Sequence, residues 1–214
     1  MLFGYLGAII GGFASAATPN WTGRPTVTAW RVAAVGGLWL AARLAILFSA
    51  TVPPLVGAAL DVVYLLILLA YAVREIFASG NRNKPILIIL FLFATACALD
   101  HAAMMGALAD PALGVHMGFA LILLLISLIG GRITPAFTRN WLMRQGTSEG
   151  LPTLPNRFDM AVISVTALAL AAWVAGPASP VAAWLLIAAG VLQFVRLARW
   201  AGLKALGDPL VFVL

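Results

Sequence analysis

Charged residues are scarce in this 214-residue chain. They make up 9% of it, whereas a soluble domain carries about 25%, and 63% of the residues are hydrophobic. A single compact core could not bury so much apolar surface and still leave a polar exterior. This composition excludes a soluble enzyme, a nucleic-acid-binding domain and a disordered chain. We therefore expect the lipid bilayer as the main partner, and no nucleic acid.

Cysteine and histidine are also scarce. The one cysteine, Cys97, lies inside an apolar run, which excludes an internal disulfide or a cysteine cluster. The 13 basic residues outnumber the seven acidic ones, but they are scattered among apolar runs and make no basic stripe of the kind that binds nucleic acid. Basic residues between apolar runs are typical of loops at membrane surfaces.

Long apolar runs dominate the rest of the chain. A membrane helix needs about 20 mostly apolar residues, and seven runs approach or exceed that length. They predict an all-α, polytopic transmembrane helical bundle with about seven spans, forming a single transmembrane domain over residues 1–214. The predicted spans are Met1 to about Ala17, about Ala29–Ala50, Val52–Ala78, Pro85–Leu108, Pro111–Gly130, Phe158–Gly176 and Ser179–Trp200, with Ser79-Gly80, Gly130-Gly131 and Gly176-Pro177 as breakers.

The loops alternate in charge. Those around Thr51, Ala109 and Pro177 contain no lysine or arginine. The positive-inside rule then places the other loops and the tail in the cytoplasm. We expect the bacterial inner (cytoplasmic) membrane, with Met1 on the outer side. The basic residues are Arg24 and Arg31, then Arg74, Arg82 and Lys84, then Arg132, Arg139, Arg144 and Arg157, and in the tail Arg196, Arg199 and Lys204.

Two opposite charges fall inside predicted spans. Arg43 precedes the outer end of its span by about seven residues, and Asp61 lies about eight residues into the next span. Their depths match, so we predict that they form an intramembrane polar pair, because an unpaired charge there is costly. A purely structural salt bridge is favoured over a proton or ligand role, which stays open.

Both histidines, His101 and His116, are predicted near the outer surface. Met104 and Met105 follow His101 at helical spacing, and Asp100 precedes it. Imidazole and thioether groups bind copper, imidazole also binds haem iron, and a nearby carboxylate can orient the ring. These two histidines and two methionines are candidate metal ligands, and Asp100 is a candidate for orienting the His101 ring. Hydrogen bonding across helices and core packing remain alternatives.

The longest predicted loop covers residues 131–157. Phe137 and Trp141 are four residues apart in it, with Arg139 and Arg144 nearby. This favours an interfacial turn that contacts lipid headgroups, while a site for a carboxylate such as a haem propionate remains open. In the first span, Gly7, Gly11 and Ser15 form a stripe of small residues that permits close helix packing.

Two stretches resemble the NnrS family. MLFGYLGAIIGGFASAATPNWTGR is similar to the second membrane segment of that family, and GRITPAFTRNWL is similar to its GRxxPxFTRN signature. The order and spacing of the two stretches also agree with the family. The matching residues are Pro19, Asn20, Trp21, Gly23, Gly131, Arg132, Pro135, Phe137, Thr138, Arg139 and Asn140.

The resemblance implies a protein of about twelve spans that contains haem and copper and is linked to nitric oxide and nitrosative stress. His101 falls where the family has a membrane histidine, and Asp100 departs from its pattern. In the family a histidine-containing segment runs into the MLFG stretch, and a further histidine follows the point where this chain ends. We therefore expect missing segments at both ends and an incomplete metal site. From the residues alone, a complete small protein stays open.

Two functions compete, and a purely structural membrane subunit is a third interpretation. The first is a haem- and copper-associated membrane protein of nitric oxide metabolism or the nitrosative-stress response, with no reaction specified. The alternative is a membrane transporter of copper, haem or another small solute, which would use the Arg43–Asp61 pair and the layer of histidine and methionine as its path. Transporters often contain internal repeats, and the sequence shows no clear one.

Overall fold

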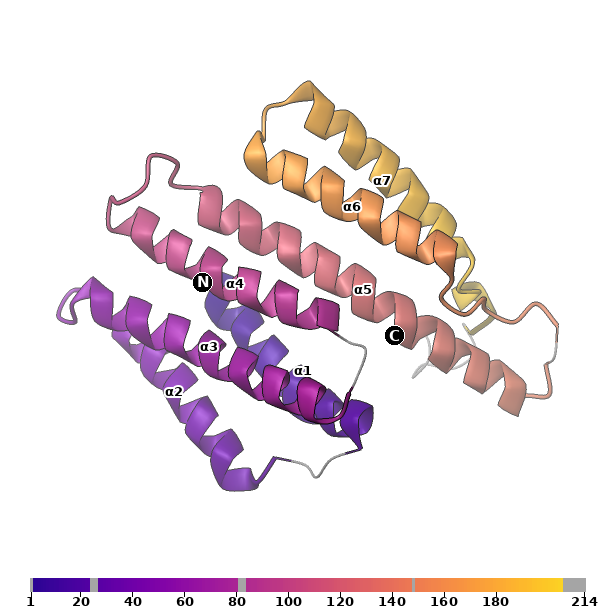
Figure 1. Ribbon diagram of the computed structural model, residues 1–214, viewed down its shortest axis with the longest axis horizontal. Helices are drawn as coiled ribbons and strands as arrows, with labels where there is room; N and C mark the ends of the chain where they lie inside the picture. The colour runs from indigo at the N-terminus through magenta and orange to yellow at the C-terminus, as the bar shows by residue number, and fades with distance from the viewer. Residues whose placement is uncertain (1, 24–26, 81–83, 148, 206–214) are drawn as a thin grey trace. The chain divides into compact units, whose positions relative to one another are not determined.

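The computed structural model describes residues 2–23, 27–80, 84–147 and 149–205. In these residues it is all-helical, and seven helices are long and apolar enough to cross a membrane. This confirms the all-α, polytopic prediction. The helices are α1 Leu2–Thr22, α2 Ala29–Leu47, α3 Pro54–Ala78, α4 Lys84–Met104, α5 Leu113–Arg144, α6 Arg157–Ala175 and α7 Pro180–Ala198, followed by the short 3-10 helix η1 Gly202–Ala205 (Figure 1). Arg24 and Arg82, which contributed to the loop-charge pattern, lie outside the described residues.

The sequence contains clear local signals for several helix starts. Pro54 and Pro180 occupy the first turns of α3 and α7, where the missing amide hydrogen costs little. Helix α6 begins with a capping box. The side chain of Asn156 accepts a hydrogen bond from the amide of Phe158, and Asp159 accepts one from the amide of Asn156.

Helix α5 is much longer than predicted. The expectation that Gly130-Gly131 ends the span, and that residues 131–157 form one loop, is wrong, because α5 continues through both glycines and Pro135 to Arg144. Glycine and proline are tolerated in membrane helices when neighbouring groups contact the weakened backbone. Phe137 and Trp141 therefore lie one helical turn apart on α5 and not on an interfacial turn.

The chain divides into two compact units. Unit 1 is Met1–Leu121 and unit 2 is Ile122–Leu214, so the division falls within α5. In unit 1, α3 contacts α1, α2 and α4, and the ring of Phe3 on α1 lies 5.2 Å from that of Phe93 on α4. Helix α2 is much less buried than α3 and α4, because Ala42 is its one buried residue.

In unit 2, α6 and α7 pack side by side (Figure 1). Several buried residues of these two helices are small. Ala169 of α6 and Ala182 and Ala189 of α7 are all buried, and small side chains of this kind let membrane helices approach closely.

Candidate metal centre

Asp61 on α3 is the centre of a polar cluster in unit 1. Its side chain is nearly inaccessible, with 6% exposed. One carboxylate oxygen accepts a hydrogen bond from the Arg43 guanidinium on α2. The other lies 3.1 Å from Nε2 of His101 on α4. Three helices thus contribute one polar group each, and the acidic charge has partners on both sides, as a buried charge requires.

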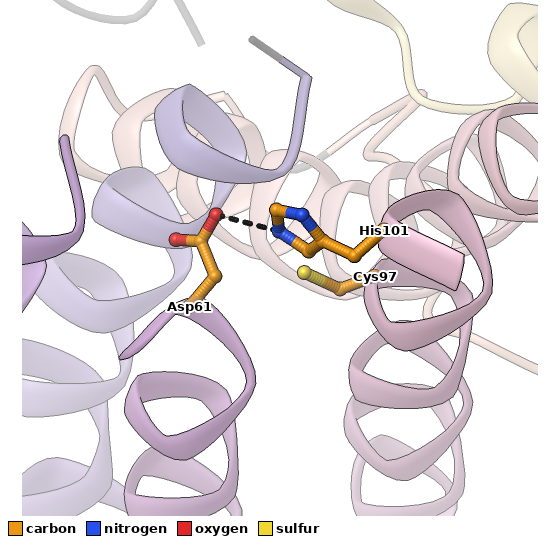
Figure 2. Close-up of side chains that lie close together, drawn as sticks. All are labelled: Asp61, Cys97 and His101. Atoms are coloured by element: carbon orange, nitrogen blue, oxygen red, sulfur yellow. Dashed lines mark hydrogen bonds and ion pairs between the residues drawn. The ribbon is translucent and has the colours of Figure 1, made fainter. Parts of the chain in front are cut away.

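Cys97 completes this cluster. It precedes His101 by one helical turn on α4, so both side chains face Asp61 (Figure 2). One donor atom from each of the three residues, a sulfur, an imidazole nitrogen and a carboxylate oxygen, lies within 4.8 Å of the other two. Cys97 is fully buried. Sequence reasoning missed it as a ligand, although the four-residue spacing of Cys97 and His101 already indicated a shared helical face.

A small cavity lies beside the cluster. Its volume is about 130 Å³, and Arg43, Asp61 and His101 contribute to its wall. Three of the predicted site residues line it as well. Asp100 is half-buried, whereas Met104 and Met105, at the end of α4, are 74% and 46% exposed. The carboxylate that contacts His101 is that of Asp61 and not that of its neighbour Asp100.

Copper and haem differ in how well they fit here. Imidazole nitrogen and thiolate sulfur are donors that copper accepts, and a carboxylate can add a third bond. Asp61, Cys97 and His101 present that set at close range. Pockets for cofactor-sized ligands usually enclose about 300–1,000 Å³, so the cavity of about 130 Å³ is too small for haem. The cluster fits a single ion.

The glycines of α1 make room for the polar side chains around this cluster. A Cβ atom at Gly4 would overlap the Arg43 guanidinium, and one at Gly11 would overlap the Tyr64 hydroxyl. The Tyr64 hydroxyl donates to the Gly7 carbonyl at 2.9 Å, and Trp39 Nε1 donates to the Gly4 carbonyl at 2.7 Å. Gly4 therefore accommodates polar groups from α2, and Gly7 and Gly11 of the small-residue stripe accommodate Tyr64 from α3.

His116 is not among the residues of the ligand group. It is half-buried on the first turns of α5, and the close group formed by described residues comprises Asp61, Cys97 and His101. Two residues earlier, a Cβ at Gly114 would overlap the backbone of Asp100, so α4 and the start of α5 approach closely there.

The first family-like motif forms the end of α1. Pro19 lies in its last turn, and Gly23 follows with φ +66°, a conformation that favours glycine. The Gly23 amide donates to the Pro19 carbonyl at 2.9 Å, which is a standard way to close a helix. The side chains of Asn20 and Trp21 lie outside the described residues.

The second motif forms one buried face of α5. Gly131, Pro135 and Thr138 are buried at spacings of four and three residues, which is the period of a helix. Arg139, partly buried, donates to the Pro152 carbonyl at 3.3 Å. The motif residues Arg132, Phe137 and Asn140 are exposed.

The buried side chain of Arg196 explains why the motif has a glycine at position 131. Arg196 on α7 is 1% exposed, and a Cβ at Gly131 would overlap its guanidinium. Arg196 Nε donates to Asp159 on α6 at 3.0 Å. One terminal nitrogen donates to the carbonyl and hydroxyl of Ser127 at 3.0 and 2.8 Å. The interpretation of Arg196 as a tail charge is wrong. Its match in depth with Asp159 on a neighbouring antiparallel helix could have indicated the pair.

Comparison with known proteins identifies the family. The family model described as NnrS protein matches residues 1–214. The chain belongs to the NnrS family. No curated protein and no solved structure matched. Membership in NnrS supports a multi-pass membrane protein and, at the level of the family, an association with haem, copper and nitric oxide.

Proposed function

We propose that this protein is a haem- and copper-associated membrane protein of nitric oxide metabolism or the nitrosative-stress response, and that Asp61, Cys97 and His101 hold its copper. The observation that carries this proposal is the approach of one sulfur, one nitrogen and one oxygen donor to within 4.8 Å of each other. Family membership supports the metal and the link to nitric oxide.

Each residue of the cluster has a separate task. His101 and Cys97 supply the nitrogen and sulfur donors from one face of α4. Asp61 would supply the oxygen donor, since its carboxylate lies 3.1 Å from Nε2 of His101. Arg43 balances the Asp61 charge and so stabilises the cluster within the membrane. Bound copper would supply a one-electron couple and an open position for a small ligand.

Copper retention tests this proposal. The protein is purified in mild detergent, loaded with Cu(I) under reducing conditions, freed of excess metal and assayed for copper per chain. His101→Ala and Cys97→Ser should each reduce the retained copper at least about tenfold, since a lost ligand commonly costs more than 1.4 kcal/mol of binding. His116→Ala, a histidine outside the group, is the matched control and should retain it. Unchanged copper in the first two variants would refute the assignment.

Transport is the second candidate, and the charged pair Arg43–Asp61 inside two spans favours it. In sealed vesicles a transporter would accumulate copper or haem in proportion to time, and it would lose that activity in the Asp61→Asn variant. A resident copper site predicts a fixed amount of copper per chain and no accumulation.

A further inference from the structure

A second and larger cavity lies in unit 1, between α1, α2 and α3. Its volume is about 860 Å³, which is within the range of sites for organic ligands. It shares no lining residue with the cavity beside the proposed copper cluster, whose ligands come from α3 and α4. Its wall is mostly apolar, and it includes Gly11 and Gly12 of α1, Val35 and Gly36 of α2, and Ile67 and Leu68 of α3.

The cavity exists because the facing helix surfaces carry small residues. Apart from the adjoining backbone of its own helix and its chain neighbours, no atom in the described part of the chain lies within 4 Å of a Cβ placed at Gly12 or Gly36. Alanines at positions 8, 16, 34 and 70 add little bulk. Helix α2 consequently has one buried residue, Ala42, although it contacts α3. In a bilayer an apolar space of this size is filled by hydrocarbon, because water gains no hydrogen bonds there.

One end of the cavity is positively charged. Arg31 is the third residue of α2 and Arg74 lies one turn before the end of α3, so these antiparallel helices bring both arginines to the same end. The Arg31 guanidinium lies 5.3 Å from the ring of Trp30, a residue type common at the membrane surface. The Arg74 side chain is 63% exposed, and its Nε lies 3.9 Å from the carboxylate of the largely buried Glu75, at the distance limit of an ion pair.

The depth of these arginines corresponds to lipid headgroups. Helix α2 has 19 residues, and at 1.5 Å per residue it is about 28 Å long, close to the thickness of the hydrocarbon core. Arg31, near its first residue, therefore lies at the edge of that core. A ligand here meets a charged end at the headgroup level and an apolar wall below it.

We propose that this cavity binds an anionic phospholipid. Its phosphate would lie between Arg31 and Arg74, and an acyl chain would run beside Gly12 and Gly36. Two observations identify this occupant: the paired positive charges suit a phosphate, and the long apolar wall suits a hydrocarbon chain. The lipid would also cover part of the α2 surface that is exposed in the structure.

Lipid analysis of the intact protein tests this. The protein, purified in mild detergent, is reconstituted with a mixture of phosphatidylglycerol and phosphatidylcholine, re-extracted and examined by native mass spectrometry. We expect one retained phosphatidylglycerol. The double variant Arg31→Gln/Arg74→Gln should reduce it about 25-fold, because each basic residue near the surface contributes about one factor of five. Arg144→Gln, an exposed arginine at the end of α5, is the matched control.

A second variant tests the apolar part. Gly12→Leu/Gly36→Leu fills the cavity and should also displace the lipid, while Gly190→Leu on α7, another site without described neighbours within 4 Å, should not. Copper content should stay unchanged in every variant, so this inference and the copper site fail separately. Equal retention of phosphatidylglycerol and phosphatidylcholine by the wild-type protein would overturn the lipid proposal. Undiminished retention of phosphatidylglycerol by both double variants would also overturn it. If a double variant lost a haem absorption band and still retained the lipid, the cavity would instead be assigned to haem.

Discussion

At the scale of single residues, Asp61 holds the candidate site together. Its carboxylate contacts both Arg43 and His101. Removal of either charged member of the Arg43–Asp61 pair leaves the other buried without its counter-charge, which costs more than replacing both by apolar residues.

A double-mutant cycle on this pair therefore has a predicted sign. Arg43→Met and Asp61→Leu should each lower the free energy of unfolding by about 3 kcal/mol, and the double variant should be more stable than either single variant. Thermal unfolding in detergent measures all four proteins. A coupling energy near zero would show that the two side chains act independently.

Gly131 allows a second residue-scale prediction. Gly131→Ala should destabilise unit 2 by about 1–3 kcal/mol, because the new methyl group displaces the hydrogen-bonded guanidinium of Arg196. The neighbouring Gly130→Ala is the control, since the described structure leaves open space around a Cβ there. Equal melting temperatures for the two variants would contradict this role of Gly131.

At the scale of elements, α5 carries the family signature on a continuous helix. Its buried positions 131, 135, 138 and 142 alternate with exposed positions 132, 137, 140 and 144. The exposed positions are contact sites for lipid or water, whereas the buried ones contact the rest of the chain.

Spin labels placed at each position from 131 to 144 should show this helix directly. Label mobility should vary with a period of about 3.6 residues, and the minima should fall at the four buried positions. A profile without that period would support the loop expected from the sequence.

The sequence predicts the helices better than it predicts their polar contacts. Apolar length and proline at the first turn indicated where α3 and α7 begin. Glycine and proline between residues 130 and 135 indicated a break in the helix. The helix continues instead, and the packing of Arg196 against Gly131 is a tertiary contact that the sequence does not show. Of the two partners of Asp61, the sequence predicted Arg43, because its depth in the membrane can be counted along the chain. It did not predict His101, because the approach of α4 depends on tertiary packing.

At the scale of the whole molecule, the charge alternation of the loops predicts an orientation. The interval between α4 and α5, at Ala109, should face outward, and the interval between α5 and α6, at Glu149, should face the cytoplasm. A membrane-impermeant thiol reagent should label Ala109→Cys in intact cells and leave Glu149→Cys unlabelled until the cells are opened. The native Cys97 is fully buried and adds no background. The reverse pattern would invert the topology.

X-ray absorption spectroscopy at the copper edge tests the central claim most directly. Copper-loaded wild-type protein should show one sulfur neighbour together with nitrogen or oxygen neighbours, as Cys97, His101 and Asp61 would provide. The sulfur contribution should disappear in Cys97→Ser and persist in the control Met105→Leu. A copper shell that contains only nitrogen and oxygen, or one that is unchanged by Cys97→Ser, would show that copper binds elsewhere.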